Sequence, residues 1–117
     1  MTARVLVLDD DVLMCQLLER LLSRQGFLVT TESSPEEALA RLGEEDFDVV
    51  LSDVNMEGLD GMAFTQRVKA AHHEVPVILI TGAGSMELAI SAVLAGAFDF
   101  LLKPLDARLL SAALQRA

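Results

Sequence analysis

Five side chains that could together bind a metal ion and a phosphate each follow a short apolar segment of the chain. They are Asp9, Asp10, Asp53, Thr81 and Lys103. Two carboxylates 4 Å apart repel each other by about 4 kcal/mol at an effective dielectric constant near 20. A cluster of three aspartates therefore needs a cation, and hard oxygen ligands favour Mg²⁺, or Mn²⁺ as an alternative, over zinc.

The remaining side chains are suited to the phosphate. Lys103 could neutralise one phosphate oxygen, and the Thr81 hydroxyl could donate a hydrogen bond to another. Gly82 leaves the next backbone N–H unobstructed, so it is a candidate phosphate contact. No histidine, cysteine or serine elbow competes as nucleophile at these positions. The residues therefore predict phosphoryl transfer to the Asp53 carboxylate, which would form an acyl phosphate.

These side chains need a scaffold that brings distant parts of the chain to one edge. Five apolar runs are typical of strands buried on both faces, at residues 5–8, 27–29, 49–51, 77–80 and 98–102. Segments of helical periodicity separate them. Five alternations predict an α/β fold: a parallel sheet in a three-layer sandwich with right-handed crossovers. Ligands of such sheets bind beyond the carboxyl ends of the strands, where all five side chains lie.

Local signals give the bounds and faces of the helices. Ser34 is a helix N-cap followed by Pro35, and Gly26 and Gly96 lie where helices should end. Further helices are expected over about 61–71, 85–95 and from 106 to the end. In the first helix the leucine spacing predicts one buried stripe, formed by Leu13, Leu17, Leu18, Leu21 and Leu22. Three polar or reactive residues have simple structural interpretations: Cys15 as an unreactive, partly buried thiol, Asp60 with Gly61 as a turn and helix cap, and Asp99 as a structural residue.

Composition excludes several classes of protein. The 117 residues predict one domain spanning 1–117. Acidic residues outnumber basic ones 18 to 9, which argues against a nucleic-acid-binding surface. One cysteine excludes an internal disulfide and a multi-thiolate zinc site. The apolar runs are shorter than the roughly 20 residues of a membrane span, and aspartates interrupt any signal-peptide core. These features predict a soluble, cytoplasmic protein without a membrane or nucleic-acid partner.

Four motifs relate the chain to a known family: VLVLDDD at 5–11, DVNMEGLDG at 53–61, ITG at 80–82 and GAFDFLLKP at 96–104. Their spacing is 43 residues from Asp10 to Asp53, 28 more to Thr81 and 22 more to Lys103. In order and spacing the chain resembles the response-regulator receiver domain of two-component signalling (the CheY-like superfamily) over essentially its whole length. The last motif is most similar to receivers of nitrogen-regulation-type transcriptional activators. The resemblance implies a flavodoxin-like five-stranded sheet in the order 2-1-3-4-5.

The resemblance assigns a role to each matching acidic residue. Asp53 resembles the phospho-acceptor, Asp10 the direct metal ligand and Asp9 a ligand that acts mainly through water. Asn55 would supply a backbone carbonyl to the metal. Asp10 with Asp11 is the alternative metal pair, but Asp11 is expected in the first helical turn, where it favours the helix dipole.

The resemblance also assigns switch residues. Thr81 resembles the hydroxyl that moves onto the phosphoryl group, and Lys103 resembles the lysine of the site, joined to Pro104 by a cis peptide bond. Phe100 resembles the aromatic switch on the fifth strand. The alternative interpretation is that Phe100 is an ordinary residue of the hydrophobic core. Receivers usually carry proline where this chain has Glu57.

The implied activity is that of a signalling switch. A sensor histidine kinase or a phosphotransfer domain would phosphorylate Asp53. The face formed by the fourth helix, fifth strand and fifth helix would then control a partner protein or an output domain outside this chain, with transcription as the regulated process. A phosphorylation-dependent homodimer is a further possible outcome. No turnover of an external substrate is expected. Two alternatives remain: a degenerate receiver that acts only as an interaction module, and a Mg²⁺-dependent phosphohydrolase, which would normally carry aspartate at the position of Asn55.

Overall fold

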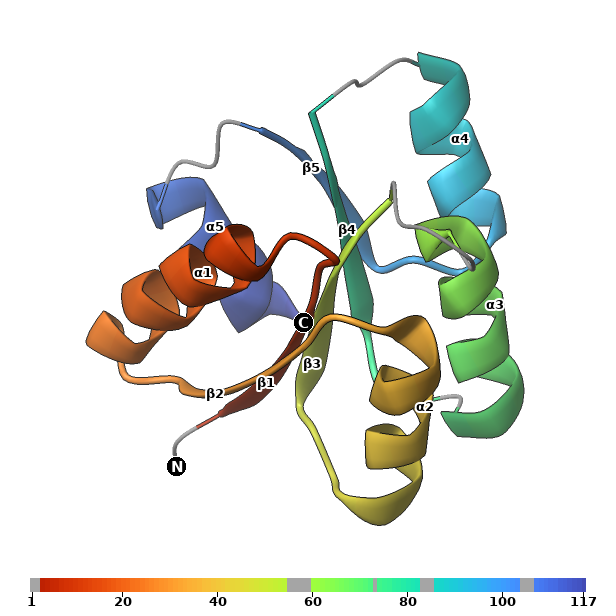
Figure 1. Cartoon of the computed structure of the whole chain (residues 1–117). Helices are drawn as coiled ribbons and strands as arrows, with labels where there is room; N and C mark the ends of the chain where they lie inside the picture. Colours follow the sequence, from red (N-terminus) through yellow and green to blue (C-terminus); the bar gives the residue numbers. More distant parts are fainter. Residues whose placement is uncertain (1–2, 55–59, 73, 83–85, 104–106) are drawn as a thin grey trace.

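The computed structural model describes residues 3–54, 60–72, 74–82, 86–103 and 107–117. Strands and helices alternate five times along the chain (Figure 1). The elements are β1 (Arg4–Leu8), α1 (Val12–Arg24), β2 (Leu28–Glu32), α2 (Pro35–Glu44), β3 (Val49–Asp53), α3 (Gly61–His72), β4 (Val77–Thr81), α4 (Met86–Leu94), β5 (Asp99–Leu102) and α5 (Ala107–Arg116).

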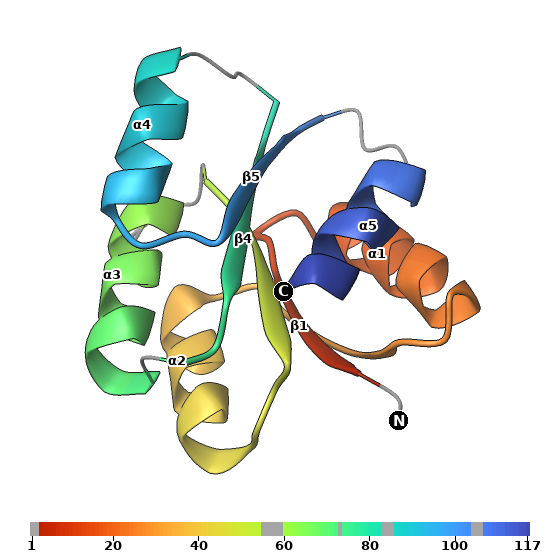
Figure 2. The same ribbon diagram turned by 180° about the vertical axis from the view of Figure 1, so that it is seen from behind.

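The strands form one parallel sheet in the order β2-β1-β3-β4-β5, which confirms the predicted fold class and strand order. Helices α1 and α5 cover one face of the sheet, and α2, α3 and α4 cover the other (Figures 1 and 2). The register pairs Val5 of β1 with Val49 of β3, and Asp53 of β3 with Ile80 of β4. The carboxyl ends of the central strands therefore meet at one edge.

Two apolar cores hold the helices onto the sheet, because the central strands are buried on both faces. The core on the α1 and α5 side includes Leu18, Leu22, Ile78 and Leu110. The core on the other side includes Phe64, which is completely buried. Burial of each large aliphatic or aromatic side chain contributes about 1.5–3 kcal/mol. Packing on both faces therefore holds the carboxyl ends of the central strands in fixed positions.

The buried face of α1 agrees only in part with the predicted leucine stripe, because Leu18 and Leu22 are buried as predicted but Leu13 and Leu17 are not. Leu13 and Leu17 are 75% and 49% exposed, whereas Cys15, Leu18 and Leu22 are buried. The buried residues are three and four positions apart, so they form a stripe of their own that is turned about half a helical turn from Leu13. Cys15, expected to be partly buried, completes the buried stripe in place of Leu13 and Leu17, in keeping with cysteine being among the most buried residue types.

Element ends follow the predicted caps more closely than the predicted strand limits. Gly26 has φ of +94° just after α1, and the Ser34 side chain accepts a hydrogen bond from the backbone N–H of Glu37 at the start of α2. Strand β2 extends to Glu32, beyond the predicted end at residue 29, because Thr30 and Thr31 pair with β1 although they are polar. β-branched residues fit such a half-buried edge strand.

Asp99 has the structural role expected from the sequence. Its carboxylate accepts hydrogen bonds from the backbone N–H of Phe100 (2.7 Å) and from the guanidinium of Arg116 (2.8 Å). It thus links the start of β5 to the last turn of α5. Among the helices in the described residues, none is both long and apolar enough to cross a membrane.

Candidate functional site

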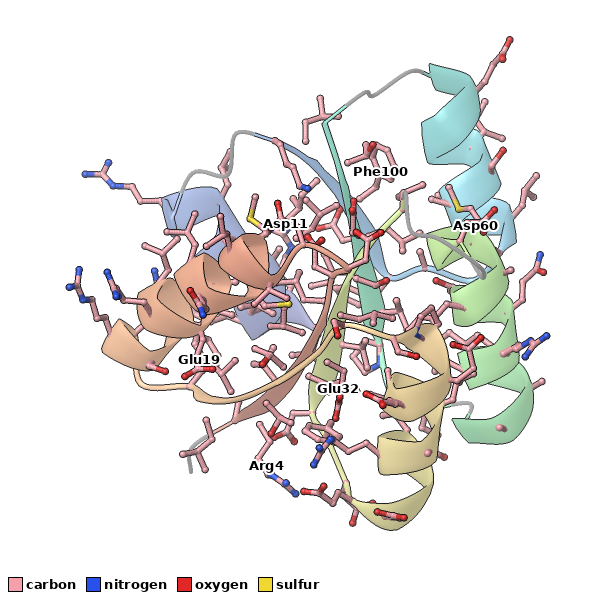
Figure 3. All side chains as sticks on the ribbon, in the orientation of Figure 1. Arg4, Asp11, Glu19, Glu32, Asp60 and Phe100 are labelled. Carbon is pink, nitrogen blue, oxygen red and sulfur yellow. The ribbon has the colours of Figure 1, made fainter. Side chains whose placement is uncertain are left out.

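The predicted site residues converge at the carboxyl edge of the sheet. Asp9 and Asp10 directly follow β1, Asp53 ends β3, Thr81 ends β4 and Lys103 directly follows β5. In Figure 3, Asp11 lies at the start of α1 on one side of this edge, and Phe100 lies on the side of α4. The topology therefore brings together residues that are up to 94 positions apart in sequence.

The three aspartates form a compact acidic cluster. One carboxylate oxygen from each of Asp9, Asp10 and Asp53 lies within 4.8 Å of the others. Asp9 is 3% exposed and Asp53 is 8% exposed, whereas Asp10 is open to solvent. The Lys103 ammonium lies 3.8 Å from Asp9 Oδ2 and 3.7 Å from Asp53 Oδ1. One ammonium offsets one of three negative charges, so the cluster keeps an excess of negative charge.

The cluster makes ionisation of Asp9 unfavourable. Burial raises the pKa of the Asp9 carboxyl above its ordinary value, and the carboxylates of Asp53 and Asp10 raise it further. The backbone N–H of Asp11, 2.9 Å from Asp9 Oδ1, and the Lys103 ammonium act in the opposite direction but do not cancel the rise in pKa. A bound cation would remove this imbalance.

Asp11 is engaged in helix capping. It is the N-cap of α1, one position before the first turn in which the sequence placed it, and its Oδ1 accepts hydrogen bonds from the backbone N–H groups of Leu13 (3.0 Å) and Met14 (3.4 Å). The carboxylate is thus directed at the helix end. This geometry favours Asp9 and Asp10, rather than Asp10 and Asp11, as the pair that accompanies Asp53.

The threonine and the lysine are joined through their backbones. Thr81 is completely buried, and its backbone oxygen accepts a hydrogen bond of 2.8 Å from the N–H of Lys103. Gly82 is exposed, and an added Cβ would meet only Lys103 Cδ at 3.9 Å, so space alone does not demand glycine there. The contact between the Gly82 backbone N–H and a phosphate therefore remains a prediction. Asn55, Glu57, Pro104 and the loop residues after Gly82 lie outside the described residues.

Helix α3 begins in direct contact with the backbone of Asp53, and the sequence did not predict this contact. A Cβ added to Gly61 would lie 2.5 Å from the Asp53 carbonyl oxygen and 2.8 Å from Val54 Cα. The Gly61 N–H donates to the Val54 carbonyl at 2.9 Å. Asp60 caps the helix by accepting the N–H of Ala63 at 2.8 Å, as the turn-and-cap interpretation implied. Gly61 therefore packs directly against the backbone of the expected acceptor, where a side chain would not fit.

Two further buried side chains contact the backbone of site aspartates, and sequence reasoning missed both. The Ser52 hydroxyl donates to the Asp53 carbonyl at 3.0 Å, and the Cys15 thiol donates to the Asp9 carbonyl at 3.2 Å. Both residues are buried. The available signal was a polar residue within an otherwise apolar strand, VVLSD, and a cysteine on a helix face otherwise formed by leucines.

Cys15 should react slowly with thiol reagents in the folded protein. Burial raises the pKa of its thiol, and the nearby Asp9 carboxylate raises it further, so the reactive thiolate is rare at neutral pH. We expect labelling by iodoacetamide at pH 7.5 to be at least about tenfold slower than in urea-unfolded protein. Mass spectrometry against time measures both rates. Equal rates in the two states would contradict this placement of the thiol.

Phe100 is half-buried and belongs to the sheet face covered by α2, α3 and α4. It packs against the core on that face and pairs in register with Leu79 of β4. Lys103 follows Phe100 by three residues, so movement of β5 would affect both the aromatic ring and the lysine. Its partial exposure distinguishes it from the completely buried Phe64.

Comparison with known proteins gives a consistent result. The response regulator receiver domain family matches residues 5–115. The chain is 42% identical over 113 residues to the transcriptional regulatory protein ZraR of Salmonella typhimurium (97% of this chain, 26% of that protein). It is 42% identical over 102 residues to the DNA-binding transcriptional regulator NtrC of the same organism (87% of this chain, 22% of that protein). The chain thus spans about a quarter of the length of these curated relatives.

Solved structures show the same similarity. A response regulator receiver domain protein from Clostridium thermocellum superposes with a TM-score of 0.92 at 37% identity, covering 97% of this chain and 92% of that one. The relatives confirm the resemblance to receivers of nitrogen-regulation-type activators. Sequence, fold and the position of the acidic cluster agree, and the chain belongs to the response regulator receiver domain family.

Proposed function

We propose that Asp53 accepts a phosphoryl group from the phosphohistidine of a sensor histidine kinase or a phosphotransfer domain. The observation that supports this most strongly is the convergence of the buried Asp53 carboxylate with two further aspartates and the Lys103 ammonium. The same convergence argues against a degenerate receiver, because both the acceptor and the lysine are in place.

Mg²⁺ is the cofactor that fits this cluster best, with Mn²⁺ as an alternative. The three side chains offer only carboxylate oxygens, which suit a hard cation, and their combined charge exceeds what Lys103 offsets. Asp9, Asp10 and Asp53 would hold the ion, together with the proposed backbone carbonyl of Asn55. The bound ion would neutralise the carboxylates and orient phosphate oxygens. The raised pKa of Asp9 supports the need for such a charge.

The proposed transfer makes one bond and breaks one. An oxygen of the Asp53 carboxylate attacks phosphorus, the P–N bond of the phosphohistidine breaks, and the imidazole leaves with the electron pair and takes up a proton. Lys103, 3.7 Å from Asp53 Oδ1, is placed to neutralise a phosphoryl oxygen, and Gly82 would offer its backbone N–H. The product is an acyl phosphate on Asp53 that water hydrolyses. Catalysis therefore serves only the domain's own phosphorylation and dephosphorylation.

Phosphorylation would change the face formed by α4, β5 and α5. The Thr81 hydroxyl would turn toward the phosphoryl group, and Phe100 would occupy the space it leaves. Each of these elements exposes large apolar side chains that a partner could cover: Ile90, Val93 and Leu94 on α4, Leu102 on β5 and Leu109 on α5. We propose that it controls an output domain or partner, or forms a phosphorylation-dependent homodimer. The names of the relatives support transcription as the regulated process.

Acetyl phosphate with Mg²⁺ tests the proposed acceptor. The wild type should gain the mass of one phosphoryl group, and hydroxylamine should remove it because acyl phosphates are labile to that nucleophile. Asp53→Asn should lose the adduct, and EDTA should suppress it in the wild type. Asp11→Asn, which keeps a capping oxygen on α1, is the matched control and should retain the adduct. An adduct that persists undiminished in Asp53→Asn would contradict the proposal.

A further inference from the structure

Ser52 is a completely buried hydroxyl one position before the proposed acceptor. Its register partners, Leu8 of β1 and Leu79 of β4, are also completely buried. A hydroxyl in such apolar surroundings destabilises a protein unless it is hydrogen-bonded. Here the Oγ of Ser52 donates to the backbone oxygen of Asp53 at 3.0 Å. The Ser52 hydroxyl, which is the polar group in the interior of β3, is therefore hydrogen-bonded to the backbone of the acceptor.

The peptide group between Asp53 and Val54 is held at both ends. Its carbonyl accepts the Ser52 hydroxyl, and its N–H donates to the Ile80 carbonyl of β4 at 2.9 Å. The start of α3 closes off the same carbonyl, because Gly61 approaches it too closely to carry a side chain. Together these contacts fix the plane of this peptide group. The backbone of Asp53 then has little freedom, and this fixes the direction of the Cα–Cβ bond from which its carboxylate extends.

We propose that Ser52 is a positioning residue for the phosphorylation of Asp53. It does not touch the phosphoryl group. It holds the Asp53–Val54 peptide, and thereby directs the carboxylate oxygen along the line of attack beside Lys103. Displacements of about 1 Å can slow such reactions about 100-fold, so a single buried hydrogen bond can affect the rate measurably. This inference rests on the proposed function of Asp53.

Thr65 offers a matched control in the same junction. Its hydroxyl is also completely buried, and it donates to the backbone oxygen of Gly61 at 2.7 Å. This bond lies within α3 and does not involve Asp53. Thr65→Val removes a buried hydroxyl with little change in volume, as Ser52→Ala does, so the two variants should lose similar stability. Only Ser52→Ala loosens the acceptor.

The experiment compares Ser52→Ala, Ser52→Cys and Thr65→Val with the wild type. For each protein, intact mass gives the rate of phosphorylation by acetyl phosphate at saturating Mg²⁺, and urea unfolding gives the stability. We expect Ser52→Ala to lower the maximal rate constant about tenfold, with the half-saturating acetyl phosphate concentration unchanged. Ser52→Cys, which keeps a weaker donor of similar size, should recover part of the rate. Thr65→Val should stay within about twofold of the wild type.

The results separate the inference from the function on which it rests. A wild type that gains no adduct contradicts the proposed function itself. If the wild type is phosphorylated, a wild-type rate in Ser52→Ala overturns the role of Ser52. An equal fall in rate in Thr65→Val also overturns it, because the rate would then follow stability alone. If Ser52→Ala does not fold, Ser52→Cys must show the lower rate, and a wild-type rate in that variant overturns the inference.

Discussion

Asp9→Asn is expected to stabilise the metal-free protein at neutral pH and to weaken its stabilisation by Mg²⁺. Asp9 is buried beside two other aspartates, and the pKa of its carboxyl is raised mainly by burial. An ionised carboxylate there disfavours the folded state. Asparagine removes the charge and keeps an oxygen that can accept the backbone N–H of Asp11. Loss of the contact of 3.8 Å with Lys103 is a smaller effect, because Lys103 keeps Asp53 as a partner.

The same residue predicts how stability changes with pH. Because the pKa of Asp9 is higher in the folded than in the unfolded state, the folded protein binds this proton more tightly. The stability from protonated Asp9 is complete below the ordinary value of 3.8 and is lost as pH rises through the raised pKa. The difference in unfolding free energy between Asp9→Asn and the wild type should therefore grow from pH 4 toward neutrality.

Urea unfolding with and without Mg²⁺ measures both effects. At a Mg²⁺ concentration 100 times its dissociation constant, the wild type should gain about 2.7 kcal/mol of unfolding free energy. Asp9→Asn should gain much less at that concentration, because one ligand has been lost. Glu19→Gln, on the exposed side of α1, controls for a general change in net charge and should respond as the wild type does. A metal-free Asp9→Asn protein less stable than the wild type at pH 7 would contradict this prediction.

Gly61→Ala is expected to damage both the fold and the site. The new Cβ would lie 2.5 Å from the Asp53 carbonyl oxygen, and neither group is a flexible side chain that could turn away. Overpacking of this kind costs about 1–3 kcal/mol of stability. Relief of the contact must move the start of α3 or the backbone of Asp53. A shift of the acceptor by about 1 Å should slow phosphorylation about 100-fold.

Gly26→Ala provides the matched control for stability. Gly26 has φ of +94° after α1, so alanine is strained there, but no atom lies within 4 Å of the added Cβ. This variant should lose about 1 kcal/mol without affecting the site. Urea unfolding and the acetyl phosphate reaction are measured on both variants. Wild-type phosphorylation of folded Gly61→Ala would show that α3 does not set the position of the acceptor.

The sequence was most informative where one requirement determines a residue type. Apolar runs and helix caps predicted the alternation of elements, because burial on both faces leaves little choice in the central strands. Asp9, Asp53 and Lys103 were predictable as neighbours because parallel strands align their carboxyl ends. On α1, leucine spacing predicted the burial of Leu18 and Leu22 but not the exposure of Leu13 and Leu17. Two overlapping stripes of similar hydrophobicity compete there, and tertiary packing selects the one that includes Cys15.

The supporting contacts of the site were less accessible from the sequence. Gly61, Ser52 and Cys15 act through backbone atoms of residues distant or adjacent in the chain, and no periodicity indicates such contacts. Ser52 is a single polar residue in the interior of an otherwise apolar strand. Strands commonly tolerate one such residue, so its presence alone does not predict a role. Its partner became evident only when the structure placed its hydroxyl 3.0 Å from the Asp53 carbonyl.

The placement of Lys103 has a consequence for the order in which the site can assemble during protein synthesis. Its ammonium is the positive charge between Asp9 and Asp53, yet it follows Asp53 by 50 residues. At about 5–20 residues per second, the ribosome needs roughly 3–10 seconds to add that stretch. A nascent chain that ends before β5 would therefore have to bring the aspartates together without the lysine. Repulsion between them should delay closure of the sheet until β5 emerges or a cation binds.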